Sequence, residues 1–447
     1  MNMNAFIDQV LKAAKDAGIS QAEVYYASGD DFEADCIKGE IANYSVSTSA
    51  GLSLRGLYQG KMGRASTEAF DDQAVDQLVR GVIQSAELIE DTAVQEIFSG
   101  SETYETVDNF SKALDRVDEK RKLELALALE KTAVAIDARV PQAEAAIVQT
   151  ASLTHTLKNT LGLSLTHKDN LAVVYLGMVG KDGDKVSSEG KIVITRDFDT
   201  LDAEAIAREA VDKTLFMLDA APVPSGTYRA VFAPEVMVSF LSTFSGVFSA
   251  ENAQQGMSLL AGKEGQTVAA PCVTLTDDPL RAGGWASCPF DGEGVACFKK
   301  NVLENGVLKT LLHNLKTAKK AGVRTTGNAS RAGYAAPVGV APTNFYFAPG
   351  ALSPDALCAQ MGDGLVILDV SGLHAGANPI SGDFSLIAKG YVVKDGKKAS
   401  AVNQITVAGN FYQLLQNIRA FGDDLTFPNG GIGSPSADVG EISVAGK

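Results

Sequence analysis

The segment GLHAGANPISGDFSL, residues 372–386, gathers side chains that could contact a substrate. It places one of the chain's four histidines among glycines, followed by an Asn-Pro step and an aspartate. Imidazole and carboxylate groups can exchange protons with a bound substrate. The residues of this segment that we consider for binding a substrate or a partner are His374, Asn378, Ser381, Gly382 and Asp383.

The same segment has a second interpretation, in which the shape of the backbone is the purpose. Gly372, Gly376 and Gly382 could adopt the unusual φ angles that other residues avoid, and Pro379 would restrict its neighbour. We favour this interpretation, in which His374 only shapes its loop.

A second set of candidates lies in TDDPLRAGGWASCPFDGEGV, residues 276–295. The stretch contains Asp277, Asp278, Asp291 and Glu293 between turn-forming residues. Paired carboxylates could act as acid and base, or bind a divalent cation. Aspartate and glycine also build turns without any catalytic role. Both interpretations stay open for Asp291 and Glu293.

Metal-binding and nucleophile motifs are missing from the sequence. There is no Gly-rich phosphate loop, no Gly-x-Ser-x-Gly elbow and no His-Glu-x-x-His helix, and no histidine has another within five residues. His155 and His167 lie on alternating strands and are expected at the surface, and His313 is expected to end a strand before a helix cap at Asn314. We therefore predict no metal site, no cofactor and no catalytic residue in this chain.

The composition excludes several functional classes. A net charge of −15 argues against nucleic acid as a partner, because phosphate binding needs a basic patch. No apolar run is long enough to span a membrane, and the N-terminal helix lacks the features of a signal peptide. Five dispersed cysteines without a Cys-x-x-Cys pair indicate buried, reduced thiols. The expected location is the cytoplasm.

The sequence pattern changes near residue 220, and this change predicts two domains. Residues 1–220 alternate long amphipathic helices with polar–apolar strands, which predicts an α+β domain of helices on a mostly antiparallel sheet. Within this domain, two subdomains could form, over 1–90 and 115–220, with an irregular surface connection over 91–117. The helices are expected within 1–20 and over 71–89, 118–136 and 201–218, and the strands over 22–27, 31–39, 40–67, 143–157, 160–167, 171–180 and 185–196.

After the turn-rich segment 219–230 the chain becomes β-rich. Asn305-Gly306 and Asp395-Gly396 each predict a two-residue type I′ hairpin. Residues 221–447 are therefore expected to form a sandwich-like or barrel-like domain with few helices. Those helices are expected over 234–249, 314–321, 353–361 and 409–421.

Several strings taken together resemble the TldD/PmbA family, whose members are named modulators of DNA gyrase. They are FDGEGV, NVLENGVLKTLLHNLKTAKKAGVRTTGNASR, PTNFYFAPG, GDGLVILDVSGLHAGANPISGDFSLIAKGYVVKDGKK and ITVAGNFYQLLQNI. The likeness is dense from about residue 225 onward and looser before it. TldD-type members carry a His-Glu-x-x-x-His helix completed by a C-terminal cysteine and look like zinc metalloproteases.

This chain resembles the PmbA (TldE) type instead. The matching helix reads PEVMVSFLSTFSGVFSAEN, and the last cysteine is Cys358, so both parts of the metal site are missing. The resemblance implies a dimer, homomeric or with a zinc-bearing TldD-type paralogue, that acts on peptides or unfolded protein, and it places the loop around His374 near the intersubunit cleft. The alternatives are an independent hydrolase that uses its carboxylates or a metal, and a non-enzymatic dimeric scaffold.

Overall fold

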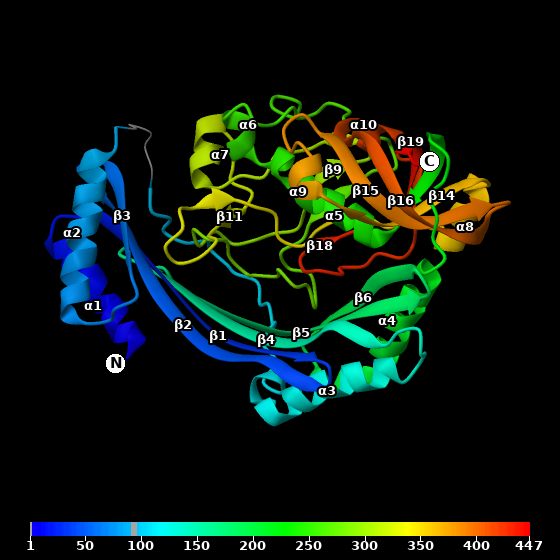
Figure 1. The fold of residues 1–447 in the computed structure, drawn as a ribbon. Helices are drawn as coiled ribbons and strands as arrows, with labels where there is room; N and C mark the ends of the chain where they lie inside the picture. Colours follow the sequence, from blue (N-terminus) through cyan, green and yellow to red (C-terminus); the bar gives the residue numbers. More distant parts are fainter. Residues whose placement is uncertain (1, 91–95) are drawn as a thin grey trace.

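A computed structural model describes residues 2–90 and 96–447. The chain has an α+β fold, as predicted, with a curved antiparallel sheet and its helices at the N-terminal end of the sequence and a β-rich C-terminal half (Figure 1). The C-terminal half lies on the concave face of the sheet (Figure 1).

The order helix, three strands, helix occurs twice in the N-terminal half. The first set is α1 (Met3–Asp16), β1 (Gln21–Ile37), β2 (Glu40–Tyr58), β3 (Lys61–Thr67) and α2 (Asp72–Leu88). The second set is α3 (Glu119–Val134), β4 (Gln142–Asn159), β5 (Ser164–Asp182), β6 (Lys185–Thr195) and α4 (Ala203–Met217). A short 3-10 turn, η1 (Leu114–Arg116), precedes the second set, and another, η2 (Phe198–Thr200), lies within it between β6 and α4. All four predicted helices are confirmed.

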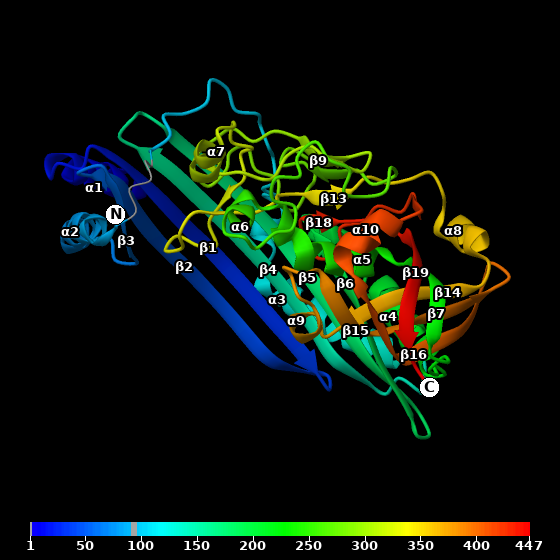
Figure 2. The same cartoon turned by 90° about the horizontal axis from the view of Figure 1, so that it is seen from above.

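The six strands form one sheet in the order β3-β2-β1-β4-β5-β6, in which β1 and β4 pair antiparallel and join the two sets. The long strands of this sheet lie side by side (Figure 2). The strand expected over 40–67 is two strands, β2 and β3, whereas two other strands are longer than predicted. The separate strands expected over 22–27 and 31–39 are one strand, β1, and those over 160–167 and 171–180 are one strand, β5. The polar residues that interrupted each pattern continue the hydrogen-bonded ladder.

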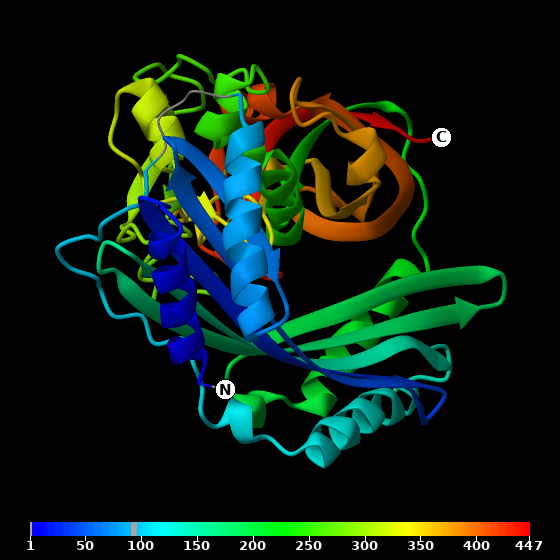
Figure 3. The ribbon, with the colours of Figure 1, turned by 90° about the vertical axis from the view of Figure 1, so that its left-hand side faces the viewer.

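The helices cover one face of this sheet. Even-numbered residues of β1 and β2, such as Val24 and Leu54, pack against α1 and α2, and even-numbered residues of β4 and β5, such as Val148 and Val174, pack against α3 and α4. Because side chains alternate along a strand, the odd-numbered residues face the C-terminal half. Figure 3 shows the helices and the C-terminal half on opposite faces.

The C-terminal half contains many short elements. Its helices are α5 (Pro234–Phe244), η3 (Ser245–Phe248), α6 (Ala250–Gln254), α7 (Leu315–Ala321), α8 (Pro354–Met361), α9 (Leu373–Gly376) and α10 (Phe411–Asn417). Its strands are β7 (Gly226–Phe232), β8 (Leu275–Asp277), β9 (Lys300–Glu304), β10 (Val307–Leu308), β11 (Ala329–Ser330), β12 (Gly339–Val340), β13 (Phe345–Phe347), β14 (Gly364–Ser371), β15 (Asp383–Lys394), β16 (Lys397–Asn410), β17 (Ala420–Phe421), β18 (Ile432–Gly433) and β19 (Ala437–Ala445).

Five of these strands close into a barrel, in the order β16-β15-β14-β7-β19, with β19 pairing back to β16. A separate sheet has the order β10-β9-β8-β13-β18. One hydrophobic core joins barrel strands, the separate sheet, α5 and α10. Within it Phe244 stacks on Phe411 with ring centroids 4.5 Å apart. The predicted barrel-like half is confirmed.

The two predicted hairpin turns are also confirmed, because Asn305, Gly306, Asp395 and Gly396 all have positive φ. Two helices are shorter than predicted. The helix expected over 234–249 ends at Phe244 and continues as the 3-10 turn η3, and the one expected over 409–421 is α10. Within the described ranges no helix is long and apolar enough to cross a membrane.

Candidate functional site

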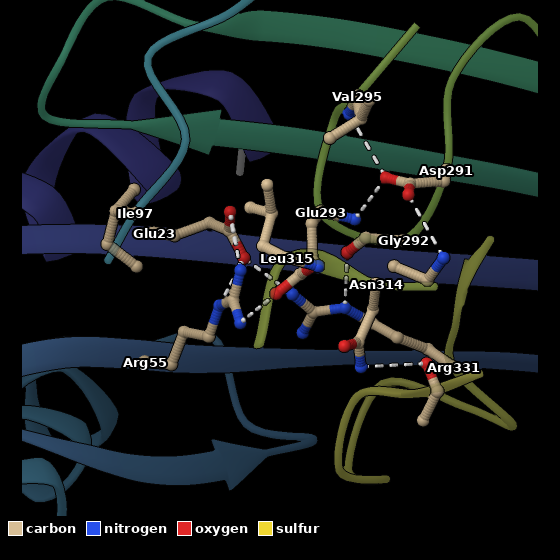
Figure 4. A network of polar contacts seen from close by, with 12 residues as sticks. Glu23, Arg55, Ile97, Asp291, Gly292, Glu293, Val295, Asn314, Leu315 and Arg331 are labelled. Carbon is tan, nitrogen blue, oxygen red and sulfur yellow. Dashed lines mark hydrogen bonds and ion pairs between the residues drawn. The ribbon is translucent and has the colours of Figure 1, made fainter. Parts of the chain in front are cut away.

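A buried network of charged residues connects the sheet to the C-terminal half. We call Glu23 on β1, Arg55 on β2, Glu293 and Arg331 the interdomain network (Figure 4). The Arg55 guanidinium donates to Glu23 Oε1 at 2.7 Å and to Glu293 Oε1 at 3.2 Å. Arg331 also donates to Glu23, and Glu293 Oε2 accepts from the backbone N–H of Leu315 at 2.9 Å.

The network is neutral and nearly closed to water. Two carboxylates face two guanidinium groups, and none of the four side chains is more than 10 % exposed. Burial lowers the pKa of Arg331. Burial also opposes the charge of Arg55, but the Glu23 and Glu293 carboxylates outweigh it and raise the pKa of Arg55. Such an arrangement holds two parts of a molecule in register, since each buried charge requires its partner.

Asp291 lies beside this network and shapes its loop. Oδ1 accepts from the N–H groups of Glu293 and Val295, at 2.9 and 3.0 Å, and Oδ2 accepts from the N–H of Ala329 at 3.0 Å. Burial, reinforced by the Glu293 carboxylate, raises the pKa of Asp291 to about 7. Both carboxylates are thus engaged by the protein itself, which favours a structural over an acid–base role for Asp291 and Glu293.

The remaining candidate residues come together at the start of β15. Asn378 Oδ1 accepts from the backbone N–H groups of Ile380 and Ser381, and the N–H of Gly382 donates to the Asn378 carbonyl at 2.9 Å. The Ser381 hydroxyl donates to Asp383 Oδ2 at 2.8 Å, and Asn410 donates to Asp383 Oδ1 at 2.9 Å. These two bonds lower the pKa of Asp383. The turn is therefore held by its own side chains.

His374 is on α9, exposed, and makes no hydrogen bond to this turn within the described chain. Gly372 and Gly382 have positive φ, as predicted, but Gly376 does not. Gly376 instead allows a close approach, because a Cβ there would lie 2.3 Å from the Ser385 carbonyl oxygen. No hydrogen bond or ion pair between described residues joins this turn to Asp291 or Glu293.

The expectation that His155 and His167 lie at the surface is wrong. They face each other across β4 and β5 on the odd-numbered face, where the C-terminal half covers them. Their ring centroids are 5.4 Å apart, and Phe290 packs on His155. Burial and the neighbouring His167 lower the pKa of His155 to about 4. The cover comes from a distant part of the sequence, so the strand pattern alone could not show it.

His313 and the cysteines largely follow the predictions. His313 is buried before Asn314, which caps α7, and its Nδ1 lies 3.2 Å from Thr317 Oγ1. All five cysteines are free thiols. Cys272 is exposed, however, so the expectation of burial is wrong for this residue.

The described residues do not offer the ligand set of a metallopeptidase. Helix α5 carries no histidine, and no group of three or more histidine, cysteine, aspartate or glutamate side chains in ranges 2–90 and 96–447 is arranged to hold a metal ion. A zinc ion needs about three protein ligands in a catalytic site. We therefore derive no catalytic step through a metal in this chain.

Three protein-family models together match most of this chain. Models of PmbA/TldA metallopeptidase domain 1, the central domain and the C-terminal domain match residues 22–86, 112–218 and 225–446. The chain belongs to the TldD/PmbA family. These matches confirm the resemblance to this metallopeptidase-like family that the sequence motifs indicated.

Relatives from bacteria and archaea match most of the length of this TldD/PmbA chain. It is 25% identical over 430 residues to a metalloprotease PmbA homolog of Haemophilus influenzae, covering 93% of this chain and 90% of that one. A solved Thermotoga maritima structure, described as a DNA gyrase modulator, superposes with a TM-score of 0.92 at 30% identity and covers 99% of this chain and 100% of its own. TldE from Thermococcus kodakarensis has the same fold, with a TM-score of 0.89, 22% identity and coverage of 99% and 100%.

The sequence interpretation missed the interdomain network except for Glu293. One signal was present: Glu23 and Arg55 each interrupt an apolar strand segment, AEVYYA and GLSLRGLY. A charged residue on the buried face of a strand requires an opposite charge nearby. The sequence alone did not show which charges those were.

Proposed function

We propose that this chain is the PmbA/TldE-type subunit of a cytoplasmic, TldD/TldE-like peptidase complex. In this proposal a TldD-type paralogue supplies the zinc, and this chain binds an extended peptide and completes the cleft. The family membership and the lack of a metal-ligand set on α5 support this division of roles.

The observation that carries the binding role is a free sheet edge. Strand β2 pairs with β1 along nearly its full length, but with β3 only over Leu52–Tyr58. Among the residues that the structure describes, 40–51 thus pair with a strand on one side only, and most of their side chains are exposed. An unpaired edge accepts a further strand through backbone hydrogen bonds, which tolerate many sequences. Such an edge suits an extended peptide.

The first test is reconstitution. We would purify this chain and a TldD-type paralogue separately, measure zinc in each by elemental analysis, and assay peptide hydrolysis by each subunit and by the mixture. The proposal expects zinc and latent activity in the paralogue, full activity only in the mixture, and a mixed dimer by light scattering. Hydrolysis by this chain alone, with one tightly bound zinc per chain, would instead establish the independent hydrolase.

The second test addresses the edge itself. Neighbouring residues of an antiparallel strand direct their N–H groups to opposite sides, so proline at Val46 and at Ser47 removes one donor to β1 and one donor to the open edge. The proline that removes a donor to the open edge breaks no bond to β1, so it should leave the thermal stability of the chain unchanged. That same variant should abolish the activity of the mixture. Full activity in both variants would show that no strand adds here. Inactivity of the mixture with an unchanged dimer would favour the non-enzymatic scaffold.

A further inference from the structure

A pocket of about 470 Å³ opens beside the interdomain network, between the sheet and the C-terminal half. Its walls come from β2, β3 and the end of α2 on one side and from α6, α7 and residues 331–338 on the other. We call it the basic pocket. Its charged lining residues are Arg55, Arg64, Lys316, Arg331, Glu251 and Glu293.

The pocket is cationic in a strongly acidic protein. Four positive groups and two carboxylates line it, whereas the whole chain carries a net charge of −15. Glu23 and Glu293 neutralise Arg55 and Arg331. The other charged residues of the lining are Arg64, Lys316 and Glu251. Of these, Arg64 is exposed, and its guanidinium makes no hydrogen bond or ion pair with any described residue.

The arrangement of β2 and β3 points to an absent anion. Arg64 lies directly opposite Arg55, and Ser66 lies opposite Ser53. Arg55 is already paired with Glu23 and Glu293, so the positive charge left for an anion at this point of the sheet is that of Arg64. The Ser53 side chain also lines the pocket and is 8 % exposed, yet its buried hydroxyl has no hydrogen-bond partner among the described residues. Buried hydroxyl groups in proteins usually have one.

We propose that the basic pocket binds the carboxylate of a peptide, most directly its C-terminus. Arginine matches a carboxylate with two parallel hydrogen bonds. The pocket lies next to the end of the free edge, since Ser53 follows residues 40–51 on β2 at the point where β3 begins to pair with β2. A peptide lying parallel to β2 along this edge therefore directs its C-terminal end toward the pocket, where β3 begins to occupy the edge. This path, though not the carboxylate site itself, rests on the proposed function.

The test measures binding to the purified full-length chain without a partner. Three fluorescently labelled probes are compared by anisotropy: Ala-Val-Ala with a free C-terminus, the same peptide as its C-terminal amide, and Ala-Asp-Ala as its amide. The acid should bind at least about tenfold more tightly than its amide, the scale of one charge-assisted hydrogen bond. Arg64→Met should remove that difference. Arg80→Met, at an exposed arginine of α2, should leave it unchanged.

Each possible result either supports or overturns the binding of a carboxylate in the basic pocket. Tight binding of the Ala-Asp-Ala amide, lost in Arg64→Met, supports the site and assigns it to an acidic side chain. Equal affinity for all three probes, or an acid–amide difference that survives Arg64→Met, overturns the proposal. Displacement by inorganic phosphate in the absence of any peptide preference overturns it as well. The binding test uses this chain without a partner. If reconstitution fails but the acid still binds more tightly than the amide, the proposed function is refuted and the carboxylate site stands.

Discussion

At the scale of single residues, the turn before β15 distinguishes loop shape from chemistry. His374 is exposed, so His374→Ala should leave the activity of the reconstituted complex within a few-fold of wild type. Gly382→Val should do more damage, because φ is +83° and the new Cβ would lie 2.7 Å from the Tyr412 ring. Strain of about 1–3 kcal/mol would fall on this turn. Peptidase rates of both variants test the ranking.

Folding controls make this comparison decisive. Circular dichroism and light scattering would confirm that both variants fold and assemble. A loss of roughly 100-fold in His374→Ala with an intact fold is the scale of a missing acid–base or oxyanion group, and it would assign His374 to the substrate site.

Asp291 predicts a pH dependence of stability. Its pKa in the folded chain is about 7, above the ordinary value of 3.8, so folding favours the protonated form. Its contribution is therefore fully present below about pH 4 and is lost as the pH rises through about 7. Asp291→Asn, which cannot titrate, should destabilise the chain more at pH 5 than at pH 8. Urea unfolding of both proteins at the two pH values measures this difference. An equal loss at both pH values would contradict it.

At the scale of elements, the interdomain network predicts a large effect of a small change. Glu23→Gln keeps the shape of the side chain but leaves Arg331 and Arg55 with one carboxylate fewer. Removing one partner from a buried ion pair costs about 3–5 kcal/mol. The free energy of unfolding should fall by this order, measured by chemical denaturation. Asp16→Asn, in the exposed pair with Lys12, is the control and should change stability little.

The sequence predicted those features that are determined by residues close together in the chain, and it missed those that depend on distant residues. Helices α1–α4 and both hairpin turns were found because their caps, periodicity and turn residues lie within one segment. The unbroken strand β5 was missed because its polar middle is covered only after the sheet and the C-terminal half meet. For the same reason the burial of His167 and the pairing of Glu23 with Arg331 were not predictable. These contacts join residues far apart in the chain.

At the scale of the whole molecule, we expect two domains, 1–220 and 221–447. Two hydrophobic cores contain only residues before this boundary, and the largest core contains only residues after it. Limited proteolysis should therefore cut between residues 219 and 228. Mass spectrometry of the fragments identifies the site, and calorimetry of the intact chain should show two unfolding transitions. A chain that resists cleavage here and unfolds in one transition would contradict the two-domain division.

The closed barrel has a consequence for how the protein is made. Strand β19 pairs with β7, the first strand of the C-terminal half, and with β16. The ribosome releases β7 long before β19, so the C-terminal half cannot complete its hydrogen-bonded ring until β19 has been synthesised. The six-stranded sheet has no such constraint, because all its strands precede residue 196. During translation the finished sheet would therefore present its odd-numbered face, with Glu23 and Arg55 uncompensated by the C-terminal half, to chaperones or to solvent.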